Sequence, residues 1–130
     1  MKARVFIEMG DDGTFGAYMP DDNKLSFGAI GEGATAEEAK QDFLNVVAEY
    51  KADGEAPEDL EFDFCYDVTS FLSYYSKRLS LAGLERITGV SQGQLSHYVT
   101  GRRNPSRKTI ERIQTALRSF GTELSSVNLV

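Results

Sequence analysis

The segment "GVSQGQLSHYVTGRRNPSRK", residues 89–108, predicts a short helix that begins directly after the end of another helix. Gly89 is suited to end the first helix in a left-handed conformation. Ser91 is followed three residues later by a glutamine, which is the spacing of a capping box at the start of the second helix. Leu95 and Tyr98 then form one apolar helical face. Two short helices joined by a tight, glycine-containing turn form a helix-turn-helix, so the segment predicts that motif.

The sequence around this motif predicts that residues 67–130 are all helical. Two sets of apolar residues at helical spacing mark the outer helices: Phe71, Leu72, Tyr75 and Leu79, and Ile110, Ile113, Leu117 and Phe120. The expected N-caps are Asp67 or Thr69 for the first helix, Ser80 for the helix over 81–88, and Ser106 for the last. Gly121 is expected to end the last helix.

The side chains of the second short helix have a chemistry that suits DNA. Gln92 and His97 are expected on its exposed face, and Gln is able to bond an adenine edge through two hydrogen bonds. Ser91 and the first free backbone N–H groups suit a phosphate. Gln94 is a further candidate, although capping at Ser91 is an alternative role for it. For His97 the alternative is a polar surface position without a ligand.

Basic residues follow the second short helix, where they would hold the flanking DNA backbone electrostatically. The candidate DNA-binding residues are therefore Ser91, Gln92, Gln94, His97, Arg102, Arg103 and Lys108. The structural alternative is a helical bundle with a solvated basic edge.

Charge divides the chain into two parts. Residues 1–67 hold 5 Lys and Arg against 17 Asp and Glu, a net charge of −12, whereas residues 68–130 hold 9 against 3, a net charge of +6. This asymmetry indicates two modules with oppositely charged partners, although solvated surface that segregates by chance is an alternative. The boundary predicted from the sequence gives domains over 1–66 and 67–130.

Composition restricts the class of protein. At 130 residues the chain fits one domain or two small ones, and 41% hydrophobic residues are ordinary for a folded, soluble protein. Cys65 is the single cysteine, which excludes an internal disulfide and a cysteine metal cluster. No secretory signal and no membrane span is visible, so a cytoplasmic protein is expected.

The acidic part predicts an α+β domain with the order β-β-β-α-β. Alternating strands are expected in "ARVFIEM", "TFGAYM" and "LEFDFCY", and a third strand in "LSFGAI", residues 25–30. Thr35 and Glu38 form a capping box, after which Ala36, Ala39, Phe43, Val46, Val47 and Tyr50 form one helical stripe. The helix is expected on one face of the sheet.

Carboxylates of the acidic part raise the alternative of a Mg²⁺-dependent nuclease. Asp11–Asp12 and Asp21–Asp22, however, lie beside turn-forming residues, and Glu37 and Glu38 lie in the first helical turn, where acids favour the helix dipole. We therefore expect no enzymatic activity, no metal site and no cofactor.

Two resemblances follow from these motifs. Residues 79–121 resemble the lambda-repressor-like helix-turn-helix, with departures at Glu85, where a small residue is usual, and at Leu81, where Gln often touches phosphate. Residues 4–66 resemble the HicB-type antitoxin domain in "E…DDGTFGAYMPD", the glycine-flanked strand and "T-x-E-E-A". Both resemblances occur in the order usual for HicB proteins.

The HicB resemblance implies a type II antitoxin with a degenerate ribonuclease H-like N-terminal domain. Such a protein binds and masks a basic, HicA-type ribonuclease toxin and represses its own operon through the C-terminal domain. The alternative is a stand-alone transcriptional regulator whose N-terminal domain senses a ligand or dimerises.

The small DNA contact of a single helix-turn-helix indicates that the protein is oligomeric. One helix-turn-helix contacts only a few base pairs, so we expect a homodimer or tetramer on an inverted repeat. Leu124, Val127 and Leu129 form an apolar tail that is suited to pair with another copy, although folding back onto its own bundle is an alternative.

Overall fold

The computed structural model describes residues 1–21 and 23–130, which divide into two compact units, Met1–Ser70 and Phe71–Val130. The boundary predicted after residue 66 coincides with the end of a strand, and the first unit continues from there to Ser70. No helix among the described residues is both long and apolar enough to cross a membrane.

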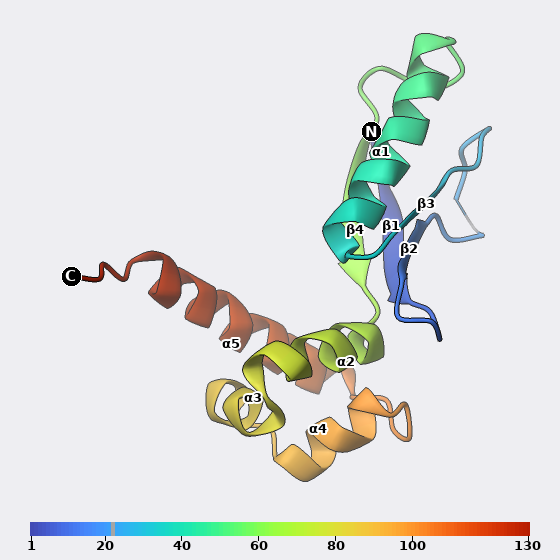
Figure 1. Ribbon diagram of the computed structural model, residues 1–130. Coiled ribbons are helices and arrows are strands. Elements are labelled where there is room, and N and C mark those ends of the chain that lie inside the picture. The colour runs from blue at the N-terminus through green and yellow to red at the C-terminus, as the bar shows by residue number, and fades with distance from the viewer. Residues whose placement is uncertain (22) are drawn as a thin grey trace. The chain divides into compact units, whose positions relative to one another are not determined.

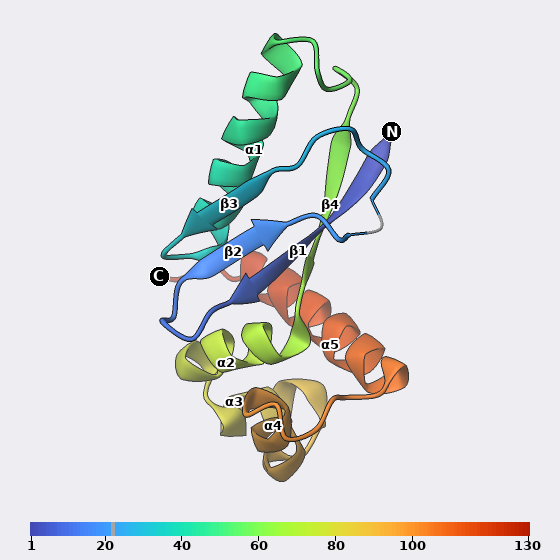
Figure 2. The ribbon, with the colours of Figure 1, turned by 90° about the vertical axis from the view of Figure 1, so that its right-hand side faces the viewer.

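The first unit is a four-stranded sheet with one helix on one face (Figure 1). Its elements are β1 (Lys2–Met9), β2 (Phe15–Tyr18), β3 (Ile30–Gly33), α1 (Ala36–Ala52) and β4 (Glu61–Tyr66). The strand order is β3-β2-β1-β4, in which β1 is antiparallel to β2 and parallel to β4 (Figure 2). The predicted β-β-β-α-β order is confirmed.

The core of this unit lies between the sheet and α1. Val5 and Ile7 of β1 are buried, as the alternation in the sequence predicts, and Phe43 of α1 is completely buried. The Phe43 ring meets the rings of Phe62 and Phe64 edge-on, at centroid distances of 5.0 and 6.0 Å. Aromatic contacts of this kind fix the helix on the sheet beyond their burial of area.

The third strand differs from the prediction. It is Ile30–Gly33 rather than residues 25–30, so the strand carries two glycines and has little intrinsic strand preference. A Cβ on Gly31 would lie 2.3 Å from the Ala39 carbonyl oxygen and 2.4 Å from the Phe43 nitrogen. The two glycines are therefore required because α1 lies directly against this strand, a tertiary constraint that local propensity does not reveal.

We predict that Gly31→Ala destabilises the first unit by at least about 1–3 kcal/mol, because a methyl group would collide with the backbone of α1. Gly28→Ala is the matched control, since a Cβ there meets nothing within 4 Å and Gly28 has no positive φ. Denaturant unfolding of the full chain measures both. Equal stabilities of the two variants would contradict the close approach of α1.

The second unit consists of helices, as predicted. They are α2 (Val68–Leu79), whose first turn belongs to the first unit, α3 (Leu81–Thr88), α4 (Gln92–Val99) and α5 (Arg107–Ser125). Buried apolar residues from the helices and the turn form its core: Leu72, Leu84, Val90, Leu95, Tyr98 and Ile113. Of the two N-caps considered for α2, Thr69 is wrong because it lies inside the helix; the Asp67 carboxylate accepts from the Ser70 N–H at 3.0 Å.

The end of α5 is a second difference. Gly121 does not end the helix, which continues to Ser125 and is capped by Ser126. Gly121 has no positive φ, and its helical conformation costs only about 1 kcal/mol relative to Ala. The start of the predicted apolar tail is thus a helical face, on which Leu124 is 55% exposed.

Candidate DNA-binding site

The turn between α3 and α4 is held by backbone and side-chain bonds. Gly89 is left-handed with φ 73°, and its N–H donates to the Glu85 carbonyl at 2.7 Å, which ends α3. The buried Thr88 hydroxyl donates to the Leu84 carbonyl at 2.7 Å and accepts from the Val90 N–H at 3.1 Å. These bonds satisfy the backbone groups at the end of α3, so the turn has a single defined geometry.

Helix α5 also contributes to this turn. Arg112 Nη2 donates to the Gly89 carbonyl at 3.1 Å, across 23 residues of sequence. A guanidinium at a helix C-terminus is favourable because it meets the negative end of the helix dipole. The spacing of apolar residues in the sequence does not reveal this role of Arg112.

Helix α4 is oriented by its two buried residues, Leu95 and Tyr98, as predicted. Ser91 is its N-cap and accepts from the Gln94 N–H at 3.3 Å. The rest of the first turn is exposed, including the side chains of Gln92 and Gln94. The geometry therefore presents two glutamine side chains at the start of α4, where a reading helix meets base edges.

Glu85 connects the two helices of the motif. Its Oε2 accepts from the Gln92 N–H at 2.8 Å, so a side chain of α3 caps the first turn of α4. The Gln92 and Gln94 amides thus already donate within the motif, and the contact of Ser91 and this helix end with a phosphate stays a prediction. A carboxylate at this helix end supplies the negative charge that a phosphate would otherwise bring.

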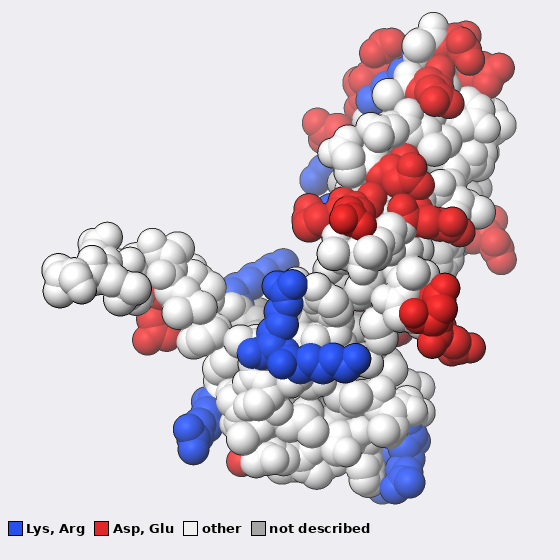
Figure 3. All heavy atoms as spheres, in the orientation of Figure 1, with Lys and Arg blue, Asp and Glu red and all other residues white. Residues whose placement is uncertain are grey.

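The loop after α4 presents the basic residues. Arg102, Arg103 and Lys108 are exposed, and the Arg103 N–H donates to the His97 carbonyl at 3.3 Å, which attaches the loop to α4. Arg107, by contrast, pairs with Glu111 at 3.3 Å. Figure 3 shows the Lys and Arg side chains mostly on the helical unit. Arg102 and Arg103 lie in the loop after α4 and Lys108 lies in the first turn of α5, positions that suit contacts with the DNA backbone beside a reading helix.

His97 lies half-buried in the last turn of α4. Its carbonyl oxygen accepts from the Thr100 hydroxyl as well as from the Arg103 N–H. His97 therefore has a structural backbone role that its residue type did not predict, and contact of its side chain with a base stays a prediction.

Two carboxylates near the start of the first unit have local structural partners. Asp12 accepts from the Thr14 hydroxyl at 2.7 Å and from its N–H, which lowers the pKa of Asp12. Glu8 accepts from the Tyr18 hydroxyl at 2.7 Å, and this bond raises the pKa of Tyr18 to about 12. Asp22 lies outside the described residues. Among the residues described, no group of three or more His, Cys, Asp or Glu side chains gathers to hold a metal ion.

Comparison with known proteins supports the second unit alone. Residues 76–119 match the family model for the helix-turn-helix, which spans α3 and α4 with parts of α2 and α5. No curated protein and no solved structure matches the chain. A helix-turn-helix presents its second helix to the major groove, so the match supports binding of double-stranded DNA by this unit, with α4 as the reading helix.

We predict that Gly89→Ala destabilises the second unit by about 1–2 kcal/mol, because an L-residue is strained at positive φ. The new methyl group would also meet the Arg112 guanidinium. Gly93→Ala, inside α4 with open space around it, should instead stabilise by about 0.5–1 kcal/mol. Thermal unfolding without DNA compares the two, and a destabilising Gly93→Ala with a neutral Gly89→Ala would refute the turn geometry.

Proposed function

We propose that the chain is a HicB-type antitoxin. In this proposal its second unit represses its own operon, and its first unit binds and masks a HicA-type ribonuclease toxin. The observation that carries the proposal is the opposite charge of the two units, with a helix-turn-helix in the basic one. A basic unit attracts DNA, and an acidic unit repels DNA and attracts a basic protein.

The DNA-binding function has the stronger support. In this proposal Gln92 and Gln94, in the exposed first turn of α4, meet base edges. Arg102 and Arg103 of the following loop and Lys108 at the start of α5 meet phosphates. In this assignment Ser91 acts as the helix cap that positions the glutamines.

Reading and anchoring are separable by mutation. Gln92→Ala should cost about 1–3 kcal/mol on the preferred duplex and relax base preference at one position. Arg102→Ala should weaken binding to all sequences alike and reduce the salt slope by about one unit. Titration of both variants against the selected duplex and a shuffled one, at several salt concentrations, measures these effects. Equal losses on both duplexes for Gln92→Ala would remove Gln92 from base reading.

Toxin binding by the first unit is supported by the resemblance of residues 4–66 to HicB proteins and by the charge of the unit. Figure 3 shows its Asp and Glu side chains spread over the surface in view. The Asp12 carboxylate accepts within its turn and the Glu38 carboxylate accepts from the Ala34 N–H, structural roles that favour a binding domain without catalysis. A small basic protein encoded beside this gene, and its binding to the full chain, would separate the antitoxin from a stand-alone regulator.

We further propose that the chain acts as a homodimer through α5. Phe120, Leu124 and Val127 continue the stripe that buries Ile113 in the core of the unit, yet Leu124 and Val127 are 55% and 53% exposed. Residues 119–130 carry a single charge, Glu123, in a unit whose other charges are mostly positive. Two copies of a basic unit approach most easily through such a neutral face.

Leu124→Glu should convert the dimer into a monomer, because it places a charge in the pairing face. Thr122→Glu is the matched control, since it adds the same charge to an exposed position on the opposite side of α5 and should leave the dimer intact. Sedimentation of the full chain at matched concentrations measures both. A wild-type monomer, or a Leu124→Glu dimer, would contradict this assignment.

A further inference from the structure

The two edge strands of the sheet in the first unit, β3 and β4, differ in the hydrogen bonding of their outward-facing backbone amides. On β3, the Glu32 N–H donates to Asp42 Oδ2 of α1 at 2.9 Å, and just beyond the strand the Ala34 N–H donates to Glu38 Oε2 at 2.9 Å. Side chains of α1 therefore occupy amides at this edge, which prevents the pairing of another strand.

The other edge of the sheet is formed by β4, which pairs only with β1 among the described strands (Figure 2). The Glu61 N–H donates to the Met1 carbonyl at 2.9 Å, and the Asp67 N–H donates to the Ile7 carbonyl at 3.0 Å. Backbone groups alternate in direction along a strand, so those of Phe62 and Phe64 point away from β1. This edge therefore presents backbone donors and acceptors to an incoming strand.

An apolar groove runs beside the same edge. It has a volume of about 320 Å³ and is lined by Leu44, Val47 and Ala48 of α1 and by Leu60, Phe62 and Phe64. Leu44 is 38% exposed at its rim, and both phenylalanines are only half-buried. An extended segment that pairs with β4 would place alternate side chains toward this groove.

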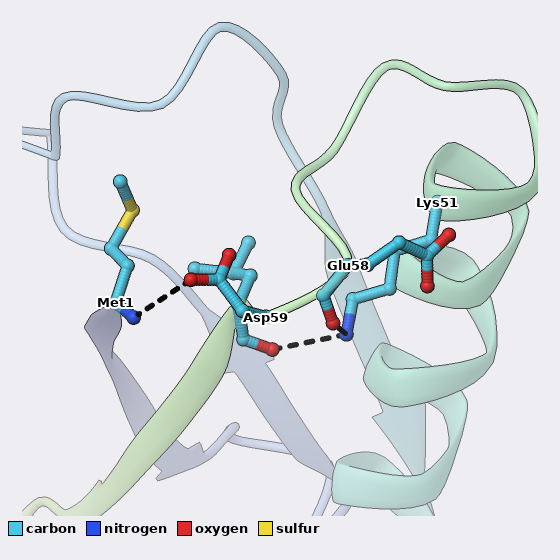
Figure 4. A network of polar contacts seen from close by, with 5 residues as sticks. Met1, Lys51, Glu58 and Asp59 are labelled. Carbon is cyan, nitrogen blue, oxygen red and sulfur yellow. Dashed lines mark hydrogen bonds and ion pairs between the residues drawn. The ribbon is translucent and has the colours of Figure 1, made fainter.

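The charged residues around the edge of β4 favour a basic partner chain. The acidic residues along β4 and the loop before it are Glu55, Glu58, Asp59, Glu61 and Asp63, all exposed. Of the cations at the groove, Lys51 directs its Nζ to the carbonyl oxygens of Glu58 and Leu60 at 3.3 and 3.0 Å, and Lys40 lies over the Phe64 ring and pairs with Glu37. The N-terminal amine lies 3.7 Å from Asp59 (Figure 4). Two copies of this edge would repel each other, whereas a basic chain would be attracted.

We propose that the open edge of β4 and its groove form the docking site for a strand of a basic partner protein, which inserts an apolar side chain beside Leu44. The identity of that partner rests on the proposed function: it is the HicA-type toxin. Main-chain hydrogen bonds to β4 supply affinity, and the groove with its acidic surroundings supplies selectivity.

The groove is tested by binding of the small basic protein encoded beside this gene to full-length variants. Leu44→Arg should weaken binding at least about tenfold, because it fills the apolar rim with a charge that repels the partner. Asn45→Arg adds the same charge on the outward side of α1 and should bind within about twofold of the wild type. Equal affinities of the two variants would overturn the groove as the docking site.

The edge itself is tested by amide hydrogen exchange of the wild-type complex. Exchange at Phe62 and Phe64 should slow on binding, whereas the Glu61 amide, which already donates to Met1, should change little. Binding without protection of Phe62 and Phe64 would overturn strand addition and leave the antitoxin function standing. If the small basic protein encoded beside this gene does not bind at all, the proposed function is wrong, and so is the assignment of that protein as the partner at β4.

Discussion

The turn at Gly89 is the constraint on which the DNA-binding geometry depends. The left-handed backbone of Gly89 ends α3. The hydrogen bonds of Thr88 and Arg112 hold the end of α3, and so the direction in which the chain enters α4. Glu85 then fixes the first turn of α4 from α3. Because these contacts come from three helices, the glutamines at the start of α4 are held by the whole unit and not by the short helix alone, which would be unstable in isolation.

The two units carry net charges of opposite sign. A surface with net negative charge opposes the approach of phosphates, so the first unit contributes nothing favourable to non-specific binding of DNA. The same surface increases the rate at which a basic protein meets it. In the proposed function, the two partners of opposite charge would therefore not compete for one surface.

Most of the fold follows from periodicity and capping. The alternation of Val5 and Ile7 and the caps at Thr35, Ser91 and Ser106 locate the strands and helices near their observed bounds. The third strand and the end of α5 differ from the prediction at glycines. Gly31 lies within β3 because α1 packs closely against it, and Gly121 continues its helix instead of ending it. Local propensity gives way to tertiary context in such places.

The candidate site was less accessible to sequence reasoning. Exposure of Gln92, Arg102 and Arg103 follows from the apolar face of α4 and from the position of the loop. The bonds of Glu85 and Arg112 join residues that no helical spacing relates, so only the folded unit brings them together. Glu85 stood out solely as a departure from the lambda-repressor-like pattern, and that departure marked a residue with a role.

The central claim, that this basic unit reads DNA sequence, is tested most directly by titrating the full chain with two duplexes. One carries the region upstream of its own gene and the other the same bases shuffled, at physiological salt. The account predicts at least about 10³-fold tighter binding to the first duplex. Equal affinity for both duplexes, with the same salt slope, would show electrostatic attraction alone and would contradict the account.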